Sequence, residues 1–214
     1  MLQPQVPVAR EGVPFIGFAA FLTLVSAASE CEILTFIFLL ATAFTLYFFR
    51  DPERFVPDDP SALISPADGK IIVIEKTDKQ DFIEGEALKI SIFMNVFNVH
   101  VNRAPIAGKV DKIIYTPGKF YSADSSQGAE YNENCGIVLT TNSGKKIAFV
   151  QVAGLIARRI VCWLEPNDTI QSGRRVGLIR FGSRVDLYLP TDTALSVSVG
   201  DKVRAGETIL GQII

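Results

Sequence analysis

The segment around residue 183 has the residue types for covalent chemistry. It reads RFGSRVD at 180–186, with apolar runs before and after it. A Gly-Ser pair between two strands commonly forms a plain bulge or turn. Alternatively the peptide is strained and the Ser183 hydroxyl attacks the Gly182 carbonyl, because glycine tolerates unusual backbone angles and lets the hydroxyl approach. β-Elimination would then break the chain and leave a dehydroalanine, which hydrolyses to a pyruvoyl group.

Two further residues could assist such chemistry. Asp68 lies in an Asp-Gly pair that opens an expected strand, where it would act either as a turn residue or as a partner of Ser183. His100 is the only histidine of the chain and lies in an apolar run between Asn98 and Asn102. A lone histidine is often a hydrogen-bonded core residue, but an imidazole also transfers protons near neutral pH.

The composition excludes several classes of protein. The net charge of −2 does not favour nucleic-acid binding, which requires a basic surplus. One histidine excludes a metal site built from several histidines, so no metal is expected. The three cysteines show no CxxC spacing, which favours small buried thiols in a reducing compartment over a disulfide framework.

The first fifty residues are strongly apolar. Residues 13–29 and 33–49 carry no charge, and Glu30 and Glu32 interrupt them. Both runs are near the lower limit of about 17–25 residues for a membrane-spanning helix, so we expect a helical hairpin that either spans the bilayer or dips into one leaflet. Arg10, Arg50 and Arg54 flank the runs and favour a cytoplasmic location for the rest of the chain. A cleaved signal peptide is the alternative for the first run.

The remainder of the chain predicts a mainly β (α+β) domain with short strands. A Pro- and Asp-rich linker at 52–60 precedes apolar runs of 4–8 residues that are rich in Ile and Val and are separated by Gly-containing turns. Two short helices are predicted at 94–99 and 156–163. The expected strands are 70–75, 88–93, 108–115, 136–140, 146–152, 176–181, 185–189, 194–197 and 208–213.

Five motifs occur in an order and at spacings typical of one family. They are FRDP at 49–52, SPADG at 65–69, IFMNVFNVHVNR at 92–103, QVAGL with ARRI at 151–160, and FGSRVD at 181–186. In these segments the chain resembles the short, archaeal/bacterial-type form of phosphatidylserine decarboxylase proenzyme. The resemblance covers residue 49 to the end, and the hydrophobic N-terminus is similarly placed.

The resemblance implies a membrane anchor at 1–50 and a pyruvoyl-dependent decarboxylase domain at 51–214. The proenzyme would cut itself between Gly182 and Ser183 into a β subunit, 1–182, and an α subunit, 183–214. These would remain a heterodimer at the cytoplasmic face of the cell membrane. The pyruvoyl group made from Ser183 would form a Schiff base with phosphatidylserine, release CO₂ and yield phosphatidylethanolamine for phospholipid biosynthesis.

The resemblance also assigns roles to the two assisting residues. His100 would return a proton to the substrate carbon, and Asp68 would help to activate Ser183. Larger family members carry two histidines three residues apart in this segment, whereas here Arg103 stands at the second position. The base for self-cleavage therefore stays open: His100 serves both steps, Asp68 assists alone, or the strained peptide needs less help.

Other functions compete with this interpretation. The substrate could be an ether-linked serine lipid, as in an archaetidylserine-type decarboxylase. Residues 198–207 resemble the second hairpin of lipoyl and biotinyl domains, which favours either shared hairpin architecture or a membrane-tethered carrier module without catalysis. Several late arginines are either solvated surface charges or contacts to lipid phosphates; they are Arg158, Arg159, Arg174, Arg175, Arg180 and Arg184.

Overall fold

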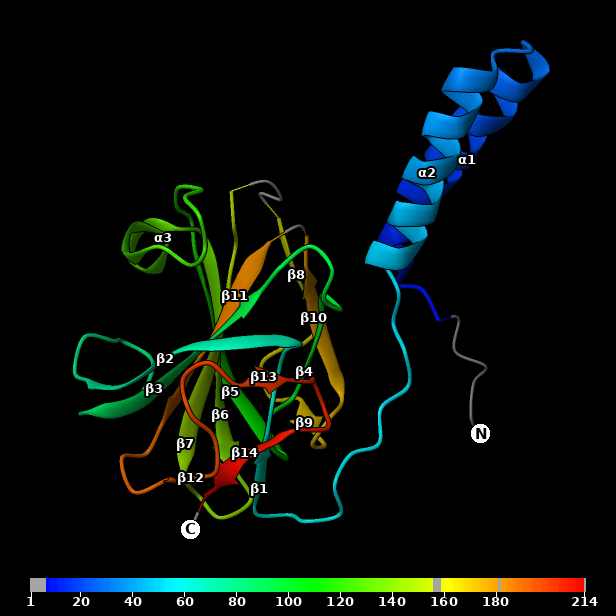
Figure 1. Cartoon of the computed structure of the whole chain (residues 1–214). Coiled ribbons are helices and arrows are strands. Elements are labelled where there is room, and N and C mark those ends of the chain that lie inside the picture. The colour runs from blue at the N-terminus through cyan, green and yellow to red at the C-terminus, as the bar shows by residue number, and fades with distance from the viewer. Residues whose placement is uncertain (1–6, 156–158, 181, 214) are drawn as a thin grey trace. The chain divides into compact units, whose positions relative to one another are not determined.

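The chain forms two compact units, an N-terminal unit that ends at Glu53 and a second unit that begins at Arg54. The computed structural model describes residues 7–155, 159–180 and 182–213 (Figure 1). The first unit is helical and the second is mostly β, as the sequence predicts.

The N-terminal unit is a pair of apolar helices, α1 (Val13–Ala28) and α2 (Glu32–Phe48), preceded by one turn of 3₁₀ helix at Arg10–Gly12. A tight turn joins the helices, with Glu30 at a positive φ of 57°. The hydroxyls of Thr23 and Thr42 lie 3.1 Å apart between the two helices. Large apolar side chains are exposed along both helices, which is unusual for a helix pair in water and suits one in lipid.

Length and composition distinguish the two helices. Continuous helix from Arg10 to Ala28 covers 19 residues with a mean hydropathy of 1.6, enough to cross a membrane by these two criteria. The second helix is apolar but shorter, at 17 residues. The predicted hairpin of two apolar helices is therefore confirmed, and the first of them has the length of a membrane span.

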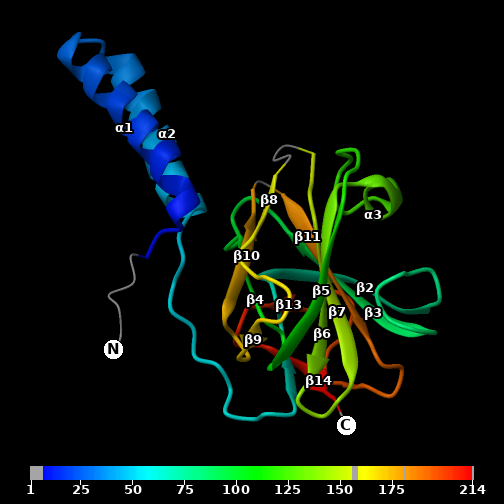
Figure 2. The same ribbon diagram turned by 180° about the vertical axis from the view of Figure 1, so that it is seen from behind.

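Over its described residues, the second unit is organised around an antiparallel sheet of eight strands in the order β13-β2-β3-β11-β7-β6-β5-β9 (Figures 1 and 2). Strand β11 lies in its interior and pairs with β3 on one side and β7 on the other. The strands are β2 (Gly69–Thr77), β3 (Ala87–Met94), β5 (Gly108–Thr116), β6 (Asn134–Thr141), β7 (Lys146–Val152), β9 (Thr169–Ile170), β11 (Ser183–Leu189) and β13 (Lys202–Val203).

Two three-stranded sheets complete the domain, in the orders β1-β14-β12 and β4-β10-β8. Their residues share one hydrophobic core with one face of the large sheet; Leu63, Val176 and Leu210 pack with Phe149 and Val185. The small sheets therefore cover the face of β11 that carries Val185. Their strands are β1 (Ala62–Ile64), β4 (Val101–Arg103), β8 (Ile160–Cys162), β10 (Arg175–Ile179), β12 (Ala194–Leu195) and β14 (Ile209–Gln212).

Two predicted helices differ from the structure. Residues 95–99 are not helical; β3 runs to Met94, and the Asn95 and Asn98 side chains then accept backbone N–H bonds in a tight turn. The predicted helix at 156–163 is wrong where it can be compared, because Ile160–Cys162 is strand β8. Residues 156–158 lie outside the described residues. One short helix was not predicted, α3 at Ser126–Tyr131.

Candidate functional site

Ser183 is the first residue of β11, and its side chain is completely buried. It pairs in register with Met94, the last residue of β3. Its hydroxyl donates to the Met94 Sδ at 3.5 Å. Because a thioether is a weak acceptor, this contact orients the hydroxyl without removing its proton. Residues two apart on a strand share a face, so Ser183 lies on the same face of the sheet as Val185, toward the core that the small sheets cover.

The backbone before Ser183 adopts a conformation that favours glycine. Gly182 has a φ of +63°, in the left-handed region. Its carbonyl oxygen lies against Gly154, where an added Cβ would stand only 1.8 Å from that oxygen. Any side chain at position 154 would therefore displace the Gly182 carbonyl, which is the group that the Ser183 hydroxyl is expected from the sequence to attack. The QVAGL motif and the FGSRVD motif thus meet at the Gly182–Ser183 peptide bond.

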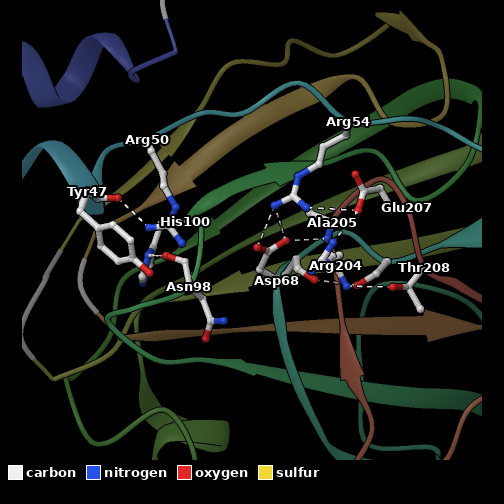
Figure 3. Close-up of polar contacts among 12 residues, drawn as sticks. Tyr47, Arg50, Arg54, Asp68, Asn98, His100, Arg204, Ala205, Glu207 and Thr208 are labelled. Carbon is white, nitrogen blue, oxygen red and sulfur yellow. Dashed lines mark hydrogen bonds and ion pairs between the residues drawn. The ribbon is translucent and has the colours of Figure 1, made fainter.

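His100 lies directly before β4 and is fully buried. Its Nδ1 is 2.9 Å from the Asn98 carbonyl oxygen (Figure 3). Since a carbonyl only accepts, Nδ1 carries the hydrogen, and Nε2 is the basic nitrogen of the neutral ring. The His100 carbonyl accepts the backbone N–H of Ile179 at 3.4 Å, which places the histidine beside the segment that leads into Ser183.

Asp68 takes part in a different set of contacts. Its carboxylate oxygens lie 3.1 and 2.9 Å from the Arg54 Nη2, and one of them also accepts the Ala205 backbone N–H at 2.8 Å (Figure 3). Arg54 also reaches Glu207 at 3.3 Å. Among the described residues, neither His100 nor Ser183 is a hydrogen-bond partner of Asp68. Asp68 lies directly before β2, and the backbones of β2 and β11 are two strand spacings apart, or about 10 Å.

Two buried amides near Ser183 did not stand out in the sequence. Asn102 on β4 and Gln151 on β7 are both fully buried, and the Gln151 Nε2 donates to the Asn102 Oδ1 at 2.8 Å. The Asn102 Nδ2 lies 3.6 Å from the Met94 Sδ, the same sulfur that accepts from Ser183. Both amides fall within the five motifs, but only the packing of the two sheets brings them together.

The structure also places two of the arginines in the interior. Arg103, at the position of the second family histidine, is buried and donates to the Gly173 carbonyl at 3.0 Å. Arg184 is buried against Asp186 with an Nε to Oδ1 distance of 2.8 Å, on the sheet face opposite Ser183. Neither predicted role, solvated charge or lipid contact, therefore applies to Arg184. Arg158 lies outside the described residues.

Two thiols approach each other beside this region. A hydrogen bond from Cys135 lowers the pKa of Cys162 to about 7. The same contact, together with burial, raises the pKa of Cys135 well above its usual range. Cys135 pairs in register with Gln151, so its thiol lies on the same inner face of the large sheet as the Gln151 amide.

Comparison with known proteins places this architecture in a family. The family model described as Phosphatidylserine decarboxylase matches residues 41–211. A phosphatidylserine decarboxylase proenzyme of Geotalea uraniireducens is 49% identical over 211 residues, covering 99% of each chain. One of Pelobacter propionicus is 50% identical over 220 residues, covering 100% of each. One of Nitratidesulfovibrio vulgaris is 48% identical, covering 99% of this chain and 97% of its own.

These matches span the helical unit and the β domain alike. The chain belongs to the phosphatidylserine decarboxylase family. The family resemblance drawn from the five motifs is thereby confirmed, and the chain is an enzyme of the decarboxylase class rather than a carrier module.

Proposed function

We propose that the chain cuts itself between Gly182 and Ser183 and then decarboxylates phosphatidylserine to phosphatidylethanolamine. The observation that carries the proposal is the Gly182–Ser183 peptide itself. A left-handed glycine directly precedes a buried serine at the start of a central strand, and Gly154 leaves room for the glycine carbonyl. Membership of a family whose named relatives are proenzymes supports the same conclusion.

The cut follows from the chemistry of the two residues. The Ser183 Oγ adds to the Gly182 carbonyl carbon, and the acyl group moves from nitrogen to oxygen to give an ester. Loss of the Cα proton of residue 183 and departure of the Gly182 carboxylate then break the chain. The dehydroalanine left behind takes up water and releases ammonia, which yields the pyruvoyl group at residue 183. This sequence requires a base for the hydroxyl proton, because the Met94 sulfur is too weak an acceptor to take it.

The surroundings of Ser183 fit such a group. The space beside Gly154 would be filled by any Cβ, and the buried amides Asn102 and Gln151 offer polar contacts on the same face of the sheet. Once formed, the group supplies a carbonyl that condenses with the substrate amine and accepts the electron pair as CO₂ leaves. The protein must hold the substrate, exclude water and deliver a proton to carbon.

We assign proton delivery to His100. The Asn98 carbonyl fixes the Nδ1 hydrogen, which leaves Nε2 to carry the mobile proton. Burial of the ring keeps this proton away from bulk water.

For Asp68 we propose a part in self-cleavage. Its contacts with Arg54 and Ala205 favour an indirect route, in which it holds the 183–214 segment in place rather than touching the hydroxyl.

The proposed location is the cytoplasmic face of the cell membrane. The first helix has the length and hydropathy of a membrane span. Arg10 lies at the start of this helix, and a basic residue there favours placing that end on the cytoplasmic side of the membrane. Arg54 is engaged with Asp68, so it does not act as a flanking membrane charge.

After the cut, the 183–214 fragment is expected to remain bound as a subunit, because β11 pairs on both sides with strands of the 1–182 fragment.

Intact-mass analysis of the purified protein tests the cut. We expect two fragments, 1–182 and 183–214, with the smaller one lighter than its encoded sequence because serine has lost its amine. Ser183→Ala should leave the chain whole and inactive. An uncut wild-type chain that releases CO₂ from phosphatidylserine would refute the proposal. Assays on ester-linked and ether-linked serine lipids in parallel would decide between the two substrate types.

A further inference from the structure

The Asn102–Gln151 pair is an unusual feature of a hydrophobic core. Both side chains are fully buried, and each belongs to a different sheet. Gln151 lies opposite Val185 on β11, and Asn102 lies opposite Gly177 on β10. Their 2.8 Å hydrogen bond therefore joins the large sheet to the β4-β10-β8 sheet, over the strand that begins with Ser183.

The hydrogen bonding of the pair is incomplete in the uncut chain. Within the part of the chain that the structure describes, the Gln151 Oε1 is buried without a hydrogen-bond partner. An unsatisfied buried polar atom costs about 1–3 kcal/mol, so its retention calls for a reason. Gly177 leaves space for this amide, since a Cβ there would lie 3.0 Å from the Nε2 and 3.3 Å from the Oε1 of Gln151.

The Asn102 amide nitrogen donates to a weak acceptor. Its Nδ2 lies 3.6 Å from the Met94 Sδ, and the Ser183 hydroxyl lies 3.5 Å from the same atom. The two donors thus converge on one sulfur. A thioether sulfur accepts a much weaker hydrogen bond from a buried amide N–H than a carbonyl oxygen does.

Cleavage would remove the hydroxyl of residue 183, because its oxygen leaves with the Gly182 carboxylate. The new keto oxygen replaces the backbone nitrogen on Cα and only accepts hydrogen bonds. Once residue 183 is no longer tethered to Gly182, this carbonyl can turn about the Cα–C bond into the space that the hydroxyl leaves. We infer that Asn102 donates its side-chain N–H to the keto oxygen of residue 183 after the cut, and that Gln151 is the positioning residue that holds the Asn102 amide for this purpose. The inference rests on the proposed function, because it requires the keto group to form.

Such a donor would polarise the carbonyl toward attack by an amine. Fixed donors aimed at a carbonyl oxygen act strongly in a buried site, and loss of one typically lowers a rate by about 10²–10³-fold. The expected consequence is a faster addition of amines to the keto carbon, independent of any lipid-binding contact. It should also lower the stretching frequency of the keto carbonyl.

The test compares three variants after self-cleavage. Asn102→Leu removes the donor, and Gln151→Met removes the group that holds it. The double variant replaces both amides by apolar side chains, which avoids an unpaired polar partner and protects folding. Ser91→Ala is the matched control, because the Ser91 hydroxyl is equally buried on β3 but faces the opposite side of the sheet, beside Asp186.

The measurements are the extent of cleavage by intact mass, the rate of oxime formation with hydroxylamine, and the infrared band of the keto carbonyl labelled with ¹³C through serine. We expect about a 10²-fold slower oxime reaction and a higher band frequency in the two variants that lack Asn102. Gln151→Met should shift both readouts in the same direction by less, and the control should leave them unchanged.

The outcomes distinguish this inference from the proposed function. A wild-type chain with no keto group would defeat the proposed function. A cut and folded double variant with the wild-type oxime rate and band position would overturn the inference alone. If Asn102→Leu and the double variant react slowly but Gln151→Met equals wild type, the positioning role of Gln151 is wrong.

Discussion

Replacement of Gly154 by alanine tests the geometry of self-cleavage most directly. The added Cβ would lie 1.8 Å from the Gly182 carbonyl oxygen, whereas real Cβ atoms are essentially never closer than 3.0 Å to such an atom. The separation must therefore grow by about 1.2 Å. Both atoms are attached to backbone, so no flexible side chain can absorb the change. The displaced group is the carbonyl that the Ser183 hydroxyl attacks in the proposed self-cleavage.

A misplacement of about 1 Å in a reacting group can lower a rate by about 10²-fold. We therefore expect Gly154→Ala to slow the appearance of the 183–214 fragment by about that factor. The assay follows chains made by cell-free synthesis with lipid vesicles, sampled over time on a denaturing gel. Thermal unfolding of the uncut Ser183→Ala background, with and without the Gly154 change, measures the accompanying loss of stability.

The matched control is Gly108→Ala. Its Cβ would also meet a carbonyl, that of Thr140 at 2.4 Å, but at the end of the β5–β6 ladder away from Ser183. Both substitutions should destabilise the fold by about 1–3 kcal/mol through overpacking. Only Gly154→Ala should slow the cut beyond the effect of lost stability. Equal cleavage rates in the two variants would show that the Gly154 contact has no part in the reaction.

Three further expectations follow from the described contacts. His100→Ala should reduce CO₂ release from labelled lipid by about 10²–10⁴-fold while most chains are still cut eventually, and Asp68→Ala should do the reverse; the opposite pattern would exchange their roles. Arg54→Met should lower the free energy of unfolding in urea by about 3–5 kcal/mol, because it leaves a buried carboxylate without its cation, and a loss below about 1 kcal/mol would contradict this. Alkylation of Cys162 should rise as the pH increases through about 7, since the thiolate is the reactive form. Cys135→Ala removes the hydrogen bond that lowers this pKa, so the midpoint should move to higher pH, and an unchanged midpoint would exclude the thiol contact as its cause.

Local pattern was sufficient to predict most of the large sheet. Runs of Ile and Val between glycine-containing turns predict β2, β3, β5, β6 and β7 to within two residues at each end. The apolar helices are equally clear, because their lack of charge is a local property. Both kinds of element can be predicted because the pattern that indicates them lies within the segment itself and does not depend on distant partners.

The shortest strands and the turn after β3 could not be predicted from local pattern. Strands β4, β8, β9 and β13 have two or three residues, too few to show a period, and exist because distant strands pair with them. The turn after β3 contains apolar residues at helical spacing, yet the side chains of Asn95 and Asn98 bind backbone N–H groups there and favour a turn instead.

The candidate site also has a part that the sequence predicts and a part that depends on distant contacts. Ser183 and Gly182 are adjacent in sequence, so their chemistry could be predicted from the residues. The contact between Gly182 and Gly154, the Arg54–Asp68 ion pair and the Asn102–Gln151 amide pair each join segments far apart in the chain. Only strand pairing and packing between these distant segments brings the groups together, and no local signal indicates which partners will meet.

The interior position of β11 has a consequence for the lifetime of the enzyme. Before the cut, an unfolded molecule is a single chain and can refold alone. After the proposed cut, the strand between β3 and β7 would belong to a separate fragment, and refolding would require the two fragments to meet, so stability would depend on their concentration. The processed enzyme would then be protected mainly by slow unfolding rather than by a reversible equilibrium. Cleavage would act as a one-way step, after which each molecule works until it first comes apart.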